Sequence, residues 1–266
     1  MSDSVFTLHR GHRPLLVSVP HAGIEIPRDV APAFLPRALA TEDADWHLDR
    51  LYAFVRDAGA SFIVPRVARY VIDLNRPPDN TPMYPGANNT ELCPIRFFDG
   101  TPLYRDAHAP TGAEVARRRE RYWAPYHAAL AAEVARLRAE HGHAVLFDGH
   151  SIRAEIPWLF EGRLADLNLG TANGTSCDAG LRAGLATVLA SSPDRTHVVD
   201  GRFKGGYITR HYGRPAEGVH TVQLEMVQAL YMDERPPFAY DPVRAAHLAP
   251  LLGRLVETML DWRPAG

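Results

Sequence analysis

The feature that most constrains the fold of this chain is the alternation of short apolar segments with longer segments of helical periodicity. Such alternation predicts an α/β sandwich, with helices packed on a central sheet that is mixed or largely parallel. The expected strands span residues 15–19, 61–64, 70–74, 144–147, 196–199 and 219–224. The expected helices span residues 43–58, 112–140 with a break or kink at Pro125, 178–190, and 241–262 with an interruption at Pro250.

Long polar segments separate these elements. Residues 75–110, 155–177 and 200–213 carry many Gly, Asn or other polar residues, so we expect them to form loops. No shift in composition marks a linker, and 266 residues are enough to bury a sizeable core. The sequence therefore predicts a single domain over residues 1–266.

Charge and cysteine content narrow the class of protein. Lys and Arg total 29 and Asp and Glu total 31, whereas a protein that follows nucleic-acid phosphates usually has a basic excess. Cys93 and Cys177 stand in no metal-ligand spacing, which fits a reducing compartment. No segment approaches the roughly 20 apolar residues that span a bilayer, and residues 1–14 contain no apolar signal core. We expect a cytoplasmic protein that binds neither nucleic acid nor membrane.

Polar and charged side chains gather where the expected strands end. In open α/β sheets, ligands bind beyond the carboxyl ends of the strands. The side chains at these ends are those of His21, Asn75, Arg76, Asp148, His150 and Glu225. If the strands are parallel neighbours, these groups meet at one edge of the sheet and form one site.

Two of these residues are candidate metal ligands. Imidazole is the commonest zinc ligand, and a catalytic zinc site usually takes three protein ligands, so His21 and His150 could share an ion. The third ligand would be a carboxylate, and Asp43, Asp45 and Glu25 are all candidates. The H-E-x-x-H helix of many zinc proteases is absent.

The other charged groups suggest roles in hydrolysis. Glu225 could take a proton from a metal-activated water, and Arg69 could stabilise an oxyanion. Arg76 could bind a substrate carboxylate through two parallel hydrogen bonds from its planar guanidinium group. A basic loop follows at residues 201–213; it lacks the spacing of a phosphate-binding P-loop. Its side chains that could hold a second carboxylate are Arg202, Lys204, Arg210 and His211.

Short motifs run in order along almost the whole chain: VPHAG at 19–23, DADWH at 43–47, VIDLNRP at 71–77, DGHS at 148–151, LNLGT at 167–171, GRFKGG at 201–206, ITRHYG at 208–213 and VQLE at 222–225. In this combination the chain resembles the N-formylglutamate amidohydrolase (N-formylglutamate deformylase) family. The resemblance implies hydrolysis of N-formyl-L-glutamate to L-glutamate and formate in histidine degradation. Because the family is similar to zinc carboxypeptidases and aspartoacylase, it also implies a phosphorylase/hydrolase-like three-layer fold with one divalent metal ion.

The resemblance further implies the metal ligands. In those relatives two His and one acid hold zinc, and the two His carry over to His21 and His150. The relatives' acid lies three residues after the first His, where this chain has Ile24. The acidic ligand must then lie elsewhere in this chain. Glu25 is one residue off that position, and in the motif at 43–47 we prefer Asp45 to Asp43. Cobalt or manganese would also suit two His and a carboxylate.

The remaining roles carry over residue by residue. Asn75 and Arg76 correspond to the pair that binds the substrate carboxylate, and Arg69 to the arginine that polarises the carbonyl. Glu225 corresponds to the general base. The expected reaction is attack of metal-activated water on the formyl carbon, with Glu225 taking the proton and delivering it to the leaving amine.

Other functions remain open from the sequence. One is metal-dependent deacylation of another N-acyl amino acid, and another is non-catalytic binding of acidic amino acids through the arginines. A metallophosphoesterase, suggested by Asp148 and His150, is disfavoured because the sequence offers no ligand set for a second metal ion. The sequence determines neither the oligomeric state nor whether the loops at 75–110 and 155–177 close over a substrate.

Overall fold

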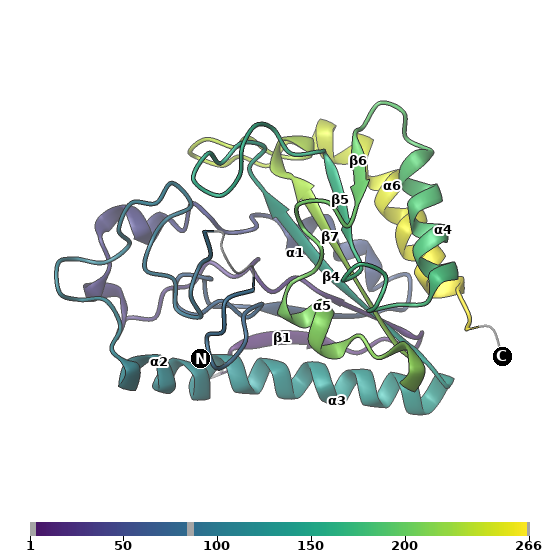
Figure 1. Cartoon of the computed structure of the whole chain (residues 1–266), viewed down its shortest axis with the longest axis horizontal. Helices are drawn as coiled ribbons and strands as arrows, with labels where there is room; N and C mark the ends of the chain where they lie inside the picture. Colours follow the sequence, from purple (N-terminus) through teal and green to yellow (C-terminus); the bar gives the residue numbers. More distant parts are fainter. Residues whose placement is uncertain (1–3, 84–87, 265–266) are drawn as a thin grey trace.

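The computed structural model describes residues 4–83 and 88–264, and one seven-stranded sheet runs through it (Figure 1). The strands are β1 (Phe6–His9), β2 (Leu15–Ser18), β3 (Ser61–Pro65), β4 (Ala144–Ile152), β5 (Leu167–Gly170), β6 (His197–Val199) and β7 (Val219–Val227). They lie in the order β1-β3-β2-β4-β7-β5-β6. Neighbours from β3 to β7 are parallel, as are β5 and β6, whereas β1 is antiparallel to β3 and β5 to β7. The expected mixed α/β sheet is confirmed.

Helices cover both faces of the sheet because successive strand residues point to opposite sides. Leu15 and Val17 of β2 belong to the apolar core under α4 (Ala179–Ala190) and α6 (Pro242–Asp261). Leu16, between them, belongs to the core under α3 (Ala124–His141). Figure 1 shows α3 along one side of the sheet and α4 and α6 along the other.

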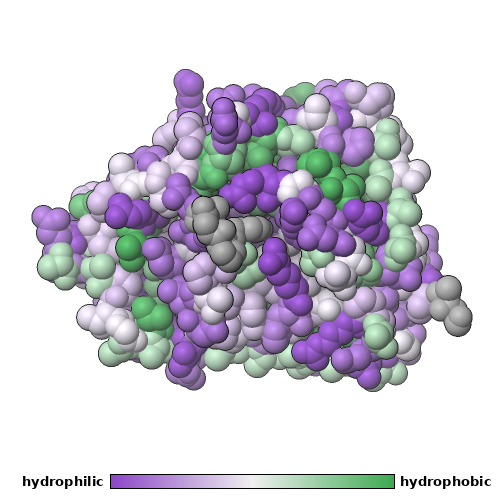
Figure 2. All heavy atoms as spheres, in the orientation of Figure 1, coloured by the Kyte–Doolittle hydropathy of each residue, from purple (hydrophilic) through white to green (hydrophobic). Residues whose placement is uncertain are grey.

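The remaining helical segments are short. They are α1 (Leu48–Leu51), α2 (Gly112–Arg118), α5 (Tyr207–Tyr212), a π-helical turn (Arg119–Trp123) and 3-10 turns at Ala31–Ala33, Pro36–Ala40, Ala53–Val55, Pro215–Glu217 and Gln228–Leu230. None of the helices in the described ranges combines the length and apolar character that a bilayer crossing requires. Figure 2 shows hydrophilic residues over most of one face, with smaller apolar patches between them.

Several expected elements are confirmed. The strands expected at 15–19, 61–64 and 196–199 are β2, β3 and β6, and the helix expected at 178–190 is α4. Asp178 caps α4 because its carboxylate accepts the backbone N–H groups of Gly180 and Leu181. The helix expected at 112–140 is not broken at Pro125: a π-helical turn joins α2 to α3, and Pro125 lies in the first turn of α3.

The strand expected at 70–74 is wrong. These residues form buried turns that follow β3, and side chains rather than a neighbouring strand bind two of their carbonyls. Arg118 donates to the Val71 carbonyl at 3.2 Å, and His127 Nε2 lies 2.8 Å from the Leu74 carbonyl oxygen. The apolar pattern therefore reports burial correctly, but tertiary hydrogen bonds replace sheet pairing.

The long helix expected at 43–58 is also wrong. Only α1 and the 3-10 turn Ala53–Val55 are helical there, and His47 precedes α1 in a left-handed conformation with φ of 63°. Upstream, the backbone N–H of Asp45 donates to the His21 carbonyl at 3.0 Å. Long-range contacts thus hold the first part of this segment in an irregular path.

Other boundaries differ in ways that affect the site. β4 and β7 continue beyond the expected ends, so His150 and Glu225 lie inside strands and not after them. The expected loops at 155–177 and 200–213 contain β5 and α5, respectively. α6 runs through Pro250 without a break; Pro250 is exposed, so water can satisfy the carbonyl that loses its helical partner.

Candidate active site

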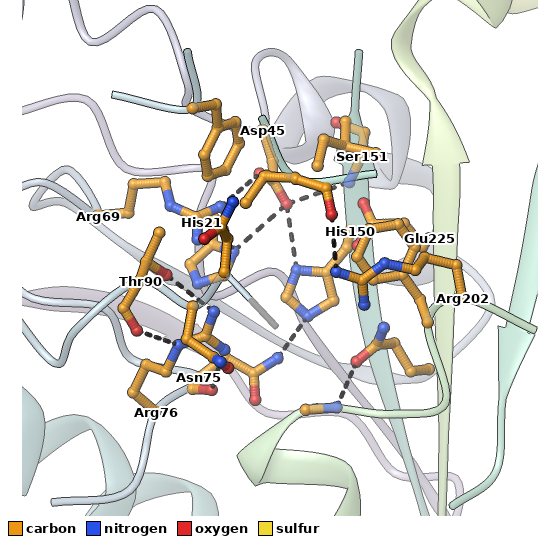
Figure 3. A pocket seen from close by; sticks show the side chains of 18 residues that line it. His21, Asp45, Arg69, Asn75, Arg76, Thr90, His150, Ser151, Arg202 and Glu225 are labelled. Atoms are coloured by element: carbon orange, nitrogen blue, oxygen red, sulfur yellow. Dashed lines mark hydrogen bonds and ion pairs between the residues drawn. The ribbon is translucent and has the colours of Figure 1, made fainter. Parts of the chain in front are cut away.

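A pocket opens at the edge of the sheet where β2, β4 and β7 carry their polar residues (Figure 3). Most residues expected in the site line this pocket: His21, Asp45, Arg69, Asn75, Arg76, His150, Arg202 and Glu225. The loop expected at 75–110 contributes Thr90 and Phe98 to its wall, and the following long segment contributes Leu159. The edge of the sheet therefore brings together groups that are far apart in the sequence.

His21, Asp45 and His150 form a compact cluster of potential metal ligands. One ligand atom from each lies within 4.8 Å of the others. Asp45 Oδ2 lies 3.7 Å from Nδ1 of His21 and 3.2 Å from Nδ1 of His150. Ligands about 2.1 Å from a tetrahedral zinc ion lie roughly 3.4 Å from one another, and both Asp45 distances are close to this value.

The remaining nitrogen of each imidazole contacts a second carboxylate. His21 Nε2 lies 2.7 Å from Asp73 Oδ1, and His150 Nε2 lies 3.0 Å from Asp148 Oδ2. A carboxylate on one ring nitrogen fixes the proton there and leaves the other nitrogen as an electron-pair donor. Both Nδ1 atoms face the Asp45 carboxylate, and His21 Nδ1 also lies 3.2 Å from Arg69 Nη1. Asp73 had no predicted role, although it stands in the motif at 71–77, as Asp148 does in the motif at 148–151.

The structure discriminates among the three candidate acidic ligands. Glu25 is exposed and lies 3.9 Å from Arg66, away from the cluster. The Asp43 carboxylate accepts hydrogen bonds from the Tyr70 hydroxyl at 2.8 Å and from the Phe98 N–H at 2.9 Å. Of the three, Asp45 alone lies with the two His.

Electrostatics keep the Asp45 carboxyl ionised. Burial alone would raise the pKa of Asp45, but the adjacent His21 and His150 imidazoles hold it below its usual range. The Ser151 N–H also donates to Asp45 Oδ2 at 3.1 Å. An anionic ligand between two imidazoles is what a divalent ion requires.

Glu225 faces the pocket from β7. Its Cα is in register with that of His150 on β4, and 7% of the residue is exposed. Burial raises the pKa of Glu225 to about 8; the Asp45 carboxylate adds to this effect, and the His150 imidazole opposes it. Within the described residues, no donor contacts its carboxylate, so this group is available to a ligand in the pocket.

Arg69 lies directly beside the metal-ligand cluster. Its Nη2 donates to Asp73 Oδ2 at 2.7 Å, and its Nη1 lies 3.7 Å from Asp45 Oδ1. The guanidinium also stacks 4.7 Å from the centre of the Phe98 ring. Burial alone would lower the pKa of Arg69, but Asp73 and Asp45 raise it, so a fixed positive charge faces the pocket.

The other two arginines of the pocket are held by the long loops. Arg76 donates to the Thr90 carbonyl at 3.0 Å and to the Thr90 hydroxyl at 2.8 Å. Arg202 donates to the Leu159 carbonyl at 3.1 Å. Figure 3 shows Arg76 and Arg202 on opposite sides of the His150 ring. The pocket thus offers cations on both sides of the cluster.

Asn75 lines the pocket, but its amide is already engaged. Its Nδ2 donates to Asp148 Oδ2 at 3.0 Å and lies 2.9 Å from His150 Nε2, while its Oδ1 accepts the Ile208 N–H at 2.8 Å. The backbone of the next residue is also fixed, because the Trp123 indole N–H donates to the Arg76 carbonyl at 3.1 Å. These contacts make Asn75 a support for the cluster.

Two residues of the basic loop lie elsewhere. Lys204 and Arg210 do not line this pocket. The Arg210 Nε donates to the Gly205 carbonyl at 3.0 Å, and its side chain borders a separate hollow beside Asn173 and Ser176. α5, which the sequence pattern did not predict, carries Arg210 away from the pocket.

Fold and cluster together define the class of protein: an α/β protein with a candidate metal site in a pocket that also contains a buried carboxylate. Residues 13–232 match the sequence model of the family described as N-formylglutamate amidohydrolase. Two curated relatives are named N-formylglutamate deformylase, at 48% identity in Pseudomonas aeruginosa and 47% in Pseudomonas putida. Each match covers 98% of this chain and 97% of the relative. The chain belongs to the N-formylglutamate amidohydrolase family and is therefore an enzyme that hydrolyses an amide C–N bond.

Solved structures agree with this assignment. An N-formylglutamate amidohydrolase from Ralstonia eutropha is 28% identical and superposes with a TM-score of 0.80, covering 96% of this chain and 95% of the other. A gene product from Agrobacterium tumefaciens superposes with a TM-score of 0.72 over 96% of this chain and 94% of its own. At 18% identity, that second likeness shows only the shared fold.

Proposed function

We propose that this enzyme hydrolyses N-formyl-L-glutamate to L-glutamate and formate. The proposal rests chiefly on one observation: the His21–Asp45–His150 cluster shares its pocket with the carboxylate of Glu225, which no donor among the described residues contacts. The names of the relatives supply the substrate. Arg76 and Arg202, on the two sides of the cluster, supply positive charge for a substrate with two carboxylates.

A divalent ion is part of the proposal, with zinc as the first choice and cobalt or manganese as alternatives. His21, Asp45 and His150 would hold it, and Asp73 and Asp148 would orient the two imidazoles. When bound, such an ion supplies Lewis acidity that polarises the formyl carbonyl and acidifies water.

Glu225 performs the proton transfers in this proposal. The carboxylate accepts a proton from the attacking water and delivers it to the amine nitrogen as the C–N bond breaks. Its burial raises its pKa to about 8, close to ordinary working pH, which suits a group that must take and return a proton. Arg69 stabilises the oxyanion that develops on the formyl oxygen.

Substrate binding is assigned to the arginines of the pocket. Arg76 forms a charge-assisted pair with one carboxylate, and Arg202 with the other. Asn75 acts by supporting Asp148 and the Arg76 backbone. We do not extend the proposal to Lys204 and Arg210, because they lie outside the pocket.

Four broader expectations belong to the same proposal. The products would place the reaction in histidine degradation. The helices on both faces of the sheet are compatible with a phosphorylase/hydrolase-like fold of the zinc-carboxypeptidase and aspartoacylase kind. Organisation as one domain over residues 1–266 and a cytoplasmic location stay predictions.

The decisive experiment measures formate release from N-formyl-L-glutamate by the purified protein. We expect release to disappear after chelation and to return with zinc, cobalt or manganese. N-acetyl-L-glutamate and N-formyl-L-aspartate should react at least about 10-fold more slowly. Faster turnover of a larger acyl group would favour a different N-acyl amino acid. Tight binding without turnover under any metal would favour an acidic-amino-acid-binding protein.

A further inference from the structure

Gln223 lines the pocket and has no role in the mechanism described above. It lies two positions before Glu225 on β7, so the two side chains point to the same face of the sheet. The Cα of Gln223 is in register with Asp148, just as that of Glu225 is in register with His150. Gln223 is 3% exposed, which places a neutral polar side chain deep beside the acidic groups.

The orientation of the Gln223 amide follows from one hydrogen bond. Its Oε1 accepts the Gly206 N–H at 2.8 Å. Because a backbone N–H can only donate, the oxygen must point to Gly206 and the NH2 group must point the other way. Among the described residues, no acceptor takes a hydrogen bond from Nε2, and Gln223 lines the pocket, so this donor is available to a ligand there.

Gly206 holds this orientation firmly. A Cβ at position 206 would lie 2.5–2.7 Å from the side-chain atoms of Asn75, so the backbone is pressed against that residue. Asn75 is in turn bound to Asp148 and to the Ile208 N–H. The Gln223 donor is therefore preorganised by the same contacts that support His150.

We propose that Gln223 is a specificity-determining residue whose Nε2 donates a hydrogen bond to a carboxylate oxygen of the substrate. This inference rests on the proposed function and extends it. A carboxylate that enters the pocket approaches the like charges of Glu225 and Asp45. An aimed N–H donor at this point offsets the repulsion, whereas a carboxylate at position 223 would add to it.

The sharpest variant is Gln223→Glu, which replaces NH2 by oxygen and keeps an acceptor for the Gly206 N–H. For N-formyl-L-glutamate we expect kcat/KM to fall on the order of 100-fold, mostly through KM. The substrate can be changed in the matching way, since N-formyl-L-glutamine and N-formyl-L-isoglutamine each carry an amide in place of one carboxylate. With one of these two substrates, the ratio of wild-type to variant kcat/KM should be at least about 10-fold smaller than with N-formyl-L-glutamate. The reason is that the amide of that substrate can donate a hydrogen bond to the carboxylate that Gln223→Glu introduces.

Thr221→Val is the matched control. Thr221 lies two positions before Gln223 on β7, and its buried hydroxyl has no hydrogen-bond partner among the described residues. The variant should retain the wild-type kcat and KM with all three substrates. Gln223→Glu activity within about twofold of wild type, or an equal loss with all three substrates, would overturn the proposal.

A binding measurement separates this inference from the proposed function. L-glutamate is titrated calorimetrically into zinc-loaded wild type and zinc-loaded Gln223→Glu protein of equal thermal stability. A dissociation constant at least about 10-fold higher in the variant supports the role of Gln223, even if the wild type releases no formate. Equal dissociation constants refute that role, whether or not formate is released.

Discussion

The Nδ1 atom of His150 lies 3.2 Å from a carboxylate oxygen of Asp45, although 105 positions separate the two residues in the chain. The Asp45 backbone N–H meanwhile donates to the His21 carbonyl at 3.0 Å. The segment that carries Asp45 is thus tied to both imidazole-bearing elements. The ligand cluster exists only when β2, β4 and this irregular segment come together.

Asp45→Asn should remove the metal site and leave the fold intact. The amide keeps the shape of the side chain but lacks the anionic charge between His21 and His150, so we expect metal affinity to fall on the order of 100-fold or more. Elemental analysis after dialysis and calorimetric titration with zinc measure this loss. Undiminished metal content in Asp45→Asn would contradict the assigned ligand set.

Asp43→Asn is the control for that variant. Its carboxylate binds Tyr70, Phe98 and Arg153 and is remote from the imidazoles. We expect it to keep its metal and to lose about 2–4 kcal/mol in the free energy of unfolding, because a buried network is broken. Urea denaturation of the two variants in parallel separates a ligand from a structural carboxylate.

Asp148→Asn should weaken the metal site without removing a ligand. The variant loses the anionic partner of His150 Nε2, and such partners typically contribute 10- to 100-fold, by order of magnitude, to metal affinity. Competition with a chelator of known affinity measures the change. A dissociation constant for zinc equal to that of the wild type would show that Asp148 does not orient His150.

Glu225→Gln should separate metal binding from turnover. The amide cannot accept the proton of the attacking water, so we expect kcat to fall by about 100- to 10,000-fold. The metal content should stay at the wild-type level, because Glu225 is outside the ligand cluster. Formate release and elemental analysis on the same sample test both points, and a fully active variant would remove Glu225 from the mechanism.

The stability of the protein should fall as the pH drops below about 6.5, in part through His127. Burial lowers the pKa of His127 to about 4, and its Nε2 lies 2.8 Å from the Leu74 carbonyl oxygen. The unfolded chain binds this proton already near pH 6.5, so the folded state loses up to about 3 kcal/mol between pH 6.5 and 4. Above pH 6.5, His127 is neutral in both the folded and the unfolded protein, and the stability that depends on its neutral form is fully present.

Urea denaturation between pH 4 and 7 measures this effect. His127→Gln should show a shallower loss of unfolding free energy than the wild type over that range, since the titrating group is gone. His108→Gln is the control, because that side chain is exposed and should leave the wild-type slope unchanged. Identical slopes for all three proteins would mean that His127 is not buried in its neutral form.

The arginines of the basic loop should differ sharply in their effect on KM. Arg202→Met removes a cation from the pocket wall, and we expect KM for N-formyl-L-glutamate to rise about 10- to 100-fold. Arg210→Met should stay within about twofold of the wild type, because Arg210 borders a separate hollow. Steady-state kinetics of the pair test the assignment, and a larger effect at Arg210 would restore that residue to the substrate site.

Much of the fold was predictable because local patterns report burial and periodicity. β2 and β3 are nearly continuous apolar runs, and α4 begins at an Asp cap, so their positions follow from nearby residues. The strand predicted at 70–74 was wrong because a buried apolar segment gives the same sequence pattern in two cases. Its backbone can be hydrogen-bonded by a neighbouring strand or, as here, by side chains. Local pattern cannot show which partner takes the backbone hydrogen bonds.

By itself the sequence determined the family, the alternation of strands and helices, and the residue types that gather at the sheet edge. Tertiary structure alone decided which groups meet there. It separated Asp45 from Asp43, placed Asp73 behind His21, and carried Arg210 away on α5. The physical reason is that a few ångströms decide whether a group can ligate, donate or repel, and the packing of distant segments sets those distances.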